Sequence, residues 1–212
     1  MNLEQLRKRV RRVSGFNMVD LYPDDDLELL INEVYVDVCG AEDWPFLYVD
    51  ADVTVDATTV DVGFPIRFVS GFTYTDADRG RLRQTTVDEL DLLPDDEREG
   101  RPEVYAHVGD SRLIVWPPPD KAYQAKLRGY RDVVPLEQDA DAPIFEPEFH
   151  PVIVYETASR LLVETGDFDR VEGLRGQAAD GISRMRVRYL SSKDRAMVQM
   201  GGRAVQPRRW RL

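Results

Sequence analysis

The stretch that decides the fold is residues 147–190, which read PEFHPVIVYETASRLLVETGDFDRVEGLRGQAADGISRMRVRYL. Apolar residues recur there every three or four positions in two successive runs, which is the spacing of one face of an α-helix. Between the runs, Gly166 accepts the left-handed conformation that ends helices, and Asp167 can cap the helix that follows. The sequence therefore predicts a helical hairpin. Its apolar positions are Val152, Tyr155, Ala158, Leu161 and Leu162, then Phe168, Val171, Leu174, Ala178, Ile182, Met185 and Tyr189.

The glycines of this stretch do not form a phosphate-binding loop, because they lack the strand, loop and helix that such a motif requires. Gly173, Gly176 and Gly181 fall inside the second helix. We expect them to permit close helix packing, at a cost of about 1 kcal/mol each in helix propensity.

Charge is segregated along the chain. Residues 184–212 carry nine basic residues against one acidic residue, and residues 1–12 carry five against one. Because the whole chain has a net charge of −11, the body between these ends is strongly acidic. An acidic body with basic ends could seek an acidic partner surface, a nucleic acid or neighbouring copies of the same chain. A solvated surface with a disordered tail is the alternative.

Few residues suggest catalysis or metal binding. A single cysteine, Cys39, excludes an internal disulfide framework, and His107 and His150 are the only histidines. We interpret Cys39 as a quiet, partly buried thiol and His150 as a capping or packing residue, since no nucleophile pairs with it. No apolar run is long enough to span a membrane. We expect no enzyme activity, no cofactor and no metal, in a protein made in the cytoplasm.

The N-terminal region predicts two helices. Asn2 and Gln5 have capping-box spacing at the start of the first helix, which Ser14 and Gly15 end. Asp25 and Glu28 have the same spacing at the start of the second helix, which stops at Gly40. These helices are expected to pack with the hairpin of residues 147–190.

From residue 47 onward the apolar spacing changes from three or four to two, which indicates strands. Gly109 and Asp110 give a tight hairpin signal between two of them. Residues 127–132 alternate as an edge or half-buried strand would. The expected strands are residues 47–55, 60–62, 66–75, 83–87, 104–108, 113–116 and 123–131. Short strands at such spacing form sandwiches or small barrels.

The predicted fold class is α+β. N-terminal and C-terminal helices form a helical bundle, and an antiparallel β module resembling a sandwich or barrel is inserted between them. The expected domains are a helical domain (1–46 and 135–192), the inserted β module (47–134) and an extended basic C-terminal tail (193–212). The tail buries too little apolar surface to order alone, so we expect it to order on a partner.

An ordered set of segments resembles the head-to-tail adaptor (connector) proteins of tailed phages and viruses. The resemblance covers about residues 3–190. It is carried by the N-terminal helix pair, Trp44-Pro45-Phe46-Leu47, Gly109-Asp110, residues 113–120, Leu127-Arg128-Gly129-Tyr130-Arg131-Asp132, Pro147-Glu148-Phe149-His150 and Gly166-Asp167-Phe168-Asp169.

The resemblance implies a structural virion protein at the head–tail junction. Members form a ring, usually of about twelve copies, that lies under the portal and extends the DNA channel toward the tail. The implied partners are further copies of the chain, the portal protein, a downstream neck or tail protein, and passing genomic DNA that is not read by sequence. No membrane is implied. The portal-docking residues would be Arg184, Arg186, Arg188, Arg195, Arg203, Arg208, Arg209, Trp210 and Arg211.

Two other functions remain open. A nucleic-acid-binding module would use the basic termini on phosphates, although the basic tail has one aromatic residue, Trp210, and so no interleaved stacking platform. A carbohydrate-binding β module of the tail-fibre kind would need aromatic side chains exposed on a sheet. Three aromatic residues are expected to share one face of a strand and would supply these side chains: Phe68, Phe72 and Tyr74.

Overall fold

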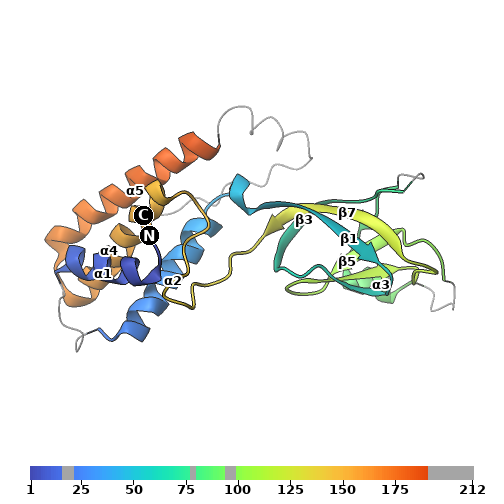
Figure 1. Ribbon diagram of the computed structural model, residues 1–212, viewed down its shortest axis with the longest axis horizontal. Helices are drawn as coiled ribbons and strands as arrows, with labels where there is room; N and C mark the ends of the chain where they lie inside the picture. Colours follow the sequence, from blue (N-terminus) through green and yellow to red (C-terminus); the bar gives the residue numbers. More distant parts are fainter. Residues whose placement is uncertain (16–21, 77–79, 94–98, 191–212) are drawn as a thin grey trace. The chain divides into compact units, whose positions relative to one another are not determined.

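The computed structural model describes residues 1–15, 22–76, 80–93 and 99–190. The chain divides into two compact units, a helical unit of Met1–Phe46 and Val133–Leu212 and a β unit of Leu47–Asp132 (Figure 1). The predicted tail of residues 193–212 lies outside the described residues. Mixed α+β architecture, with terminal helices packed together and two small sheets inserted, confirms the predicted fold class.

The first helix begins and ends where the sequence predicts. Helix α1 spans Leu3–Ser14, and Asn2 and Gln5 form a capping box at its start. The Asn2 side chain accepts a hydrogen bond from the Gln5 backbone N–H at 2.9 Å. At the other end, Gly15 has a φ of 78°, the left-handed conformation that glycine adopts without strain.

The second helix corrects one prediction. Helix α2 spans Asp24–Gly40, and its N-cap is Pro23, which has no side-chain hydrogen bond to offer. Asp25 and Glu28 therefore form no capping box, because Asp25 already lies inside the helix. The acidic residues of the first turn instead favour the helix start through the positive end of the helix dipole.

The predicted hairpin is confirmed. After the short 3₁₀ helix η2 (Pro147–Phe149), α4 spans His150–Thr165 and α5 spans Phe168–Tyr189. Gly166 has a φ of 77° between them, and its N–H bonds back to the carbonyl groups of Leu162 and Val163. Asp167 is the N-cap of α5 but makes no side-chain capping bond. Phe168 is 66% exposed, so its predicted place in the apolar stripe is wrong.

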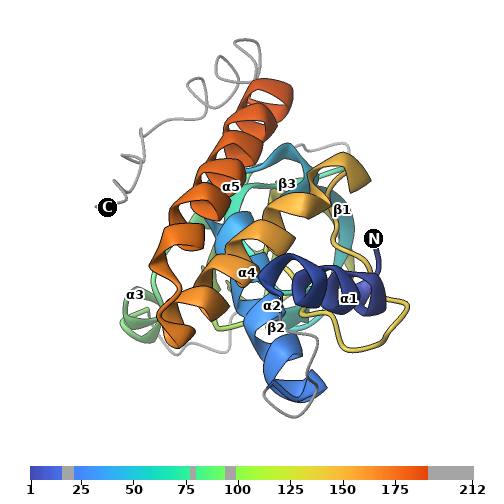
Figure 2. The ribbon, with the colours of Figure 1, turned by 90° about the vertical axis from the view of Figure 1, so that its left-hand side faces the viewer.

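Helix α4 is the centre of the helical unit. It packs against α1, α2 and α5, and it lies between α5 and the α1–α2 pair (Figure 2). Gly181 permits the close α4–α5 contact, since a Cβ there would overlap Val152. Gly173 and Gly176 have nothing within 4 Å of a Cβ position, so the packing role predicted for them is wrong.

An aromatic step follows α2. Trp44 is fully buried, and its indole N–H donates a hydrogen bond to the Val38 carbonyl at 2.8 Å. Its ring stacks on Phe46 of the 3₁₀ helix η1 (Pro45–Leu47), with ring centroids 5.8 Å apart, and meets Tyr189 edge-on. These rings fix the end of α5 against the segment after α2.

The β unit contains two sheets over one shared core. One has the order β1-β7-β3, and the other has the order β2-β6-β5-β4. Buried residues of both sheets, including Val55, Phe72, Leu113 and Leu127, belong to one hydrophobic cluster, as a sandwich requires. The strands are β1 (Tyr48–Val55), β2 (Thr59–Asp61), β3 (Ile66–Tyr74), β4 (Arg83–Gln84), β5 (Val104–His107), β6 (Arg112–Trp116) and β7 (Tyr123–Arg131).

Three details differ from the sequence predictions. Strand β7 is central and not an edge, since it pairs with both β1 and β3. Strand β4 pairs with β5 in parallel, so the second sheet is not wholly antiparallel. Residues 83–87 were expected to be a strand, but the helix α3 (Val87–Asp91) begins within them behind a capping box of Thr86 and Glu89. The hairpin at Gly109 and Asp110 is confirmed by positive φ at both residues.

The register of β3 shifts twice against β7, between Ile66 and Phe68 and between Val69 and Gly71. Such shifts reverse which side chains face the core. Phe72 and Tyr74 are buried, whereas Phe68 is 38% exposed. The prediction that Phe68, Phe72 and Tyr74 share one exposed face is therefore wrong.

Candidate interaction surfaces

The described residues contain no group of three or more His, Cys, Asp or Glu side chains that could hold a metal ion. Among these same residues, no helix is both long enough and apolar enough to cross a membrane. The candidate functional sites of the described residues are therefore surfaces.

His150 is a packing residue in the helical unit. It is 2% exposed, its Nε2 lies 2.9 Å from the Phe145 carbonyl, and its Nδ1 lies 2.5 Å from the Met1 amino group. Nε2–H therefore donates to the carbonyl while Nδ1 accepts from the amine. Burial lowers the pKa of His150, since a charged imidazole would lose its hydration. Cys39 is fully buried rather than partly buried.

Three of the nine predicted portal-docking residues lie near the end of α5. Arg186 pairs with Glu42 at 2.8 Å, Arg184 pairs with Asp180 at 3.3 Å, and Arg188 lies 3.6 Å from Glu146. The side chains of Arg184 and Arg188 are more than 60% exposed, so these two ion pairs hold them weakly. The other six, Arg195, Arg203, Arg208, Arg209, Trp210 and Arg211, lie outside the described residues.

Helices α1 and α2 are joined by ion pairs whose arginine side chains are largely buried. Arg7 pairs with Glu28, and Arg11 pairs with Asp24 at 2.5 Å. Arg7 also pairs with Asp139, in the segment that leads to α4. The side chains of both arginines are less than 15% exposed, so these charges hold the two helices together inside the unit.

Four polar residues of α1 face outward. The α1 outer face consists of Gln5, Lys8, Arg9 and Arg12, all exposed and spaced along one side of the helix. Lys8 pairs with Glu4 at 2.5 Å. Within the described part of the chain, Arg9 and Arg12 have no carboxylate within 4 Å. This face therefore presents two guanidinium groups that no described carboxylate compensates.

Helix α2 has an outer face of opposite charge. The α2 outer face consists of Asp25, Asp26, Leu29, Glu33 and Val36, all exposed, and α2 contains no basic residue. Leu29 is 63% exposed and Val36 is 44% exposed. Among the described residues, no basic group lies within 4 Å of the carboxylates of Asp25, Asp26 or Glu33.

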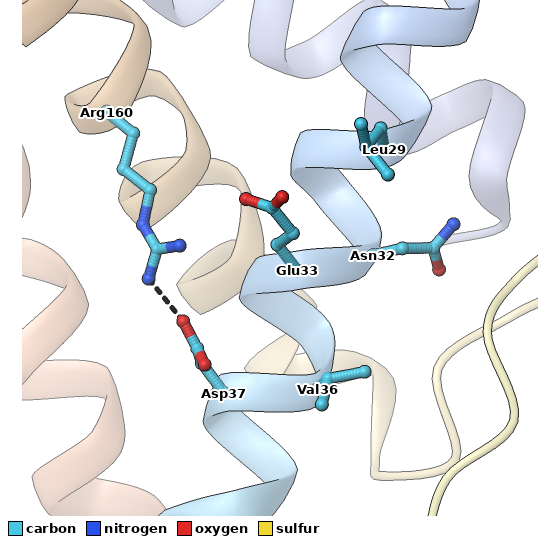
Figure 3. A pocket seen from close by; sticks show the side chains of 6 residues that line it. All are labelled: Leu29, Asn32, Glu33, Val36, Asp37 and Arg160. Carbon is cyan, nitrogen blue, oxygen red and sulfur yellow. Dashed lines mark hydrogen bonds and ion pairs between the residues drawn. The ribbon is translucent and has the colours of Figure 1, made fainter.

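An open groove of about 370 Å³ runs beside this face, between α2 and Arg160 of α4 (Figure 3). Arg160 pairs with Asp37 at 2.6 Å across it. Leu29, Asn32, Glu33 and Val36 complete the lining. Small-molecule sites enclose most of their ligand, whereas this groove is open along its length. Its shape suits a protein surface better than a small ligand.

The β unit carries an aromatic cluster on the outer face of its first sheet. Tyr48 meets Tyr130 edge-on with ring centroids 5.6 Å apart, and Phe68 stacks on Tyr130 at 4.9 Å. The three residues come from β1, β7 and β3, and they are paired neighbours in the sheet. Asp50 pairs with Arg128 and Lys126 on the same two strands as Tyr48 and Tyr130.

The β unit also contains a hollow lined by three arginines. Arg81, Arg83 and Arg101 line it together with Tyr74 and neighbouring backbone. Arg101 lies over the Tyr74 ring at 4.1 Å and pairs with Asp76 at 2.9 Å. Burial raises the pKa of Tyr74 to about 12, so its hydroxyl remains a hydrogen-bond donor, here to the Pro102 carbonyl.

Sequence reasoning identified the basic and acidic segments but not their faces. The counts for residues 1–12 did not separate the inward Arg7 and Arg11 from the outward Arg9 and Arg12. A helical projection could have done so, since Leu3, Leu6 and Val10 mark the buried side. The aromatic cluster depends on strand pairing and register, which no local pattern contains.

Comparison with known protein families identifies the family of the chain. A family model described as SU10 adaptor protein matches residues 1–209, which includes both units. No curated protein matches the chain. The family match confirms the resemblance to phage adaptor proteins, which are structural rather than catalytic. The chain belongs to the SU10 adaptor protein family of phage structural proteins.

Proposed function

We propose that this protein is a head-to-tail adaptor that forms a ring of about twelve copies beneath the portal and joins the capsid to the tail. Its place in the virion is then the head–tail junction. The observation that carries the proposal is the family match over residues 1–209. The segregation of charge supports it, since an acidic body with basic ends matches a part that contacts several neighbours.

The proposed ring extends the DNA channel. Carboxylates that line a tunnel repel DNA phosphates, so DNA slides through without sticking. The chain has 39 acidic residues against 28 basic ones, and the basic ones are concentrated at the two ends. Genomic DNA would thus pass without sequence-specific binding.

The basic C-terminal segment is proposed to dock on the portal. Arg184, Arg186 and Arg188 form its base on α5, and Arg195, Arg203, Arg208, Arg209 and Arg211 follow in the sequence. Trp210 would be its apolar anchor, because Trp and Arg are the side chains most often found at interface hot spots. The β unit is proposed to contact a downstream neck or tail protein.

The decisive experiment mixes the full-length chain with the portal protein of the same virus and measures the mass and symmetry of the complex by native mass spectrometry and electron microscopy. The proposal requires a closed ring of adaptor copies on the portal. Deletion of residues 201–212 should leave the unfolding curve unchanged and abolish portal binding. Arg175→Glu, an exposed reversal on α5 outside the docking set, is the control and should bind normally. A chain that never joins the portal would contradict the proposal.

A nucleic-acid-binding function predicts a different salt response. If the tail met eight phosphates on duplex DNA, log affinity would fall with log salt with a slope of about −7. The adaptor proposal instead predicts little DNA affinity at physiological salt. Fluorescence anisotropy with a labelled duplex across a salt series separates the two functions.

A carbohydrate-binding β unit is supported by one observation, the aromatic cluster in which exposed Tyr48 and Phe68 flank the partly buried Tyr130. Aromatic faces beside carboxylates such as Asp50 are a surface on which sugar rings can stack and hydrogen-bond. Screening the chain against host-surface glycans tests this second function. Phe68→Ser should abolish any binding, whereas Gln124→Ser, an exposed change on β7 away from the cluster, should not.

A further inference from the structure

Two faces of the helical unit have opposite charge and no compensating partner among the described residues. The α1 outer face presents Arg9 and Arg12, and the α2 outer face presents Asp25, Asp26 and Glu33. Inside the unit the same two helices are already joined by arginine–carboxylate pairs, Arg7 with Glu28 and Arg11 with Asp24. The outward arginines and carboxylates have the same complementary charges, so the acidic face of one copy can pair with the basic face of another.

We propose that the α1 outer face of one copy docks on the α2 outer face of the next copy. This inference rests on the proposed ring and identifies which surfaces build it. Arg9 and Arg12 would pair with Glu33 and Asp26, and the aliphatic stems of the arginines would cover Leu29 and Val36. Leu29 is 63% exposed and lies between the carboxylates, so the docked stems would bury apolar surface that the single copy leaves in water.

The two faces belong to different helices, and this decides the kind of assembly. A contact between two different patches is heterologous, and it generates a ring when the rotation between copies closes. A two-fold dimer would need one patch to pair with itself. Like charges would then meet, because the α1 outer face has only basic charges and the α2 outer face only acidic ones.

A second copy explains the faces better than a nucleic acid does. The α1 outer face runs from Gln5 to Arg12, about 10 Å of helix, and presents three cations, of which Lys8 is paired with Glu4. It has no aromatic side chain on which a base could stack. A nucleic acid on α1 would also leave the acidic α2 outer face without a partner.

The test uses two reversed chains. The acid-reversed chain carries Glu33→Arg and Asp26→Arg, and the base-reversed chain carries Arg9→Glu and Arg12→Glu. In each chain alone the two faces have the same sign, so assembly should require more than about tenfold higher concentration than the wild type. In an equal mixture, the native basic α1 face of the acid-reversed chain can meet the native acidic α2 face of the base-reversed chain. The two reversed faces can likewise meet each other with opposite charge. Assembly should therefore return, with the two chains alternating around the ring.

Native mass spectrometry and sedimentation velocity read out the assemblies, alone and on the portal. Two separate control variants reverse a charge at exposed positions of α5. Glu172→Arg matches the kind of change in the acid-reversed chain, Arg175→Glu matches that in the base-reversed chain, and both should assemble as the wild type does. Circular dichroism melts check that each chain folds. Because Asp26 lies in the first turn of α2, where an acidic residue favours the helix, Glu33→Arg alone replaces the double variant if the latter unfolds.

Each result bears on one proposal. A wild-type chain that forms no ring, even on the portal, overturns the proposed function itself. A wild-type ring together with reversed chains that assemble normally overturns only the α1–α2 contact. Reversed chains that fail alone and fail in the mixture show that these two faces do not meet each other. Loss of DNA affinity in the base-reversed chain, with assembly intact, assigns α1 to nucleic acid instead. Restoration in the mixture supports the inference.

Discussion

Gly181 of α5 lies directly against Val152 of α4, where an added Cβ would overlap the valine side chain. Gly181→Ala should therefore push the helices apart and lower the free energy of unfolding by about 1–3 kcal/mol. Chemical denaturation at constant pH measures the change. Gly176→Ala, in the same helix but with open space at its Cβ position, should instead stabilise the protein by up to about 1 kcal/mol. Equal effects at the two positions would contradict the close packing.

Gly129 is the glycine of the β unit at which an added Cβ would overlap a neighbouring element, as at Gly181. It lies in β7 where the β3 backbone carbonyl of Phe68 approaches, so a Cβ would overlap that oxygen. Backbone atoms cannot rotate away as a side chain can, and Gly129→Ala should destabilise the β unit by about 2 kcal/mol or more. Gly71→Ala on β3 has open space and should change stability by less than about 0.5 kcal/mol. Urea melts followed by circular dichroism compare the two variants.

Asn32 of α2 fixes the segment that leads to α4. Its side-chain amide donates to the Leu136 carbonyl at 3.0 Å and accepts from the Leu136 N–H at 2.8 Å. Asn32→Ala leaves both buried backbone groups of Leu136 without a partner and should cost about 1–3 kcal/mol. Glu172→Ala, at an exposed position of α5 outside the proposed contact faces, is the control and should be nearly neutral. Thermal melts that do not distinguish the two variants would refute the role of Asn32.

His150 should make stability depend on pH. Its folded-state pKa is lowered by burial, so below the ordinary histidine pKa of about 6.5 the unfolded chain takes up a proton that the folded chain does not. The free energy of unfolding should therefore fall as the pH drops from 7.5 to 5.5. His150→Asn should reduce this slope even if it lowers stability overall, whereas His107→Asn should retain it. Denaturant melts at four pH values decide the matter, and an unchanged slope in His150→Asn would contradict the assignment.

Local chemistry predicted the helices well. The Asn2–Gln5 capping box and Gly15 set both ends of α1, and Gly166 turns the chain between α4 and α5, because caps and left-handed glycines act within a few residues. The Asp25–Glu28 spacing misled, since α2 begins behind Pro23 and Asp25 is already its second residue. The α3 helix was missed although Thr86 and Glu89 carry the signal that correctly placed α1.

Non-local pairing explains the other errors. The parallel contact of β4 with β5 and the central position of β7 depend on segments far apart in the chain. The register shifts of β3 turn Phe68 outward and Phe72 inward, and strict alternation cannot anticipate such shifts. For the candidate surfaces, the sequence supplied the signs of the charges. Which arginines of α1 face α2 and which face solvent followed only from the packing.

Tyr48, the first residue of β1, pairs with Tyr130, the second-last residue of β7. The chain therefore enters and leaves the β unit through neighbouring strands about 5 Å apart. A module whose two ends lie together can be exchanged as a cassette. A short glycine-rich bridge between residues 46 and 133 would then leave a helical remainder that folds around α4, and a different β cassette could be grafted at the same two points.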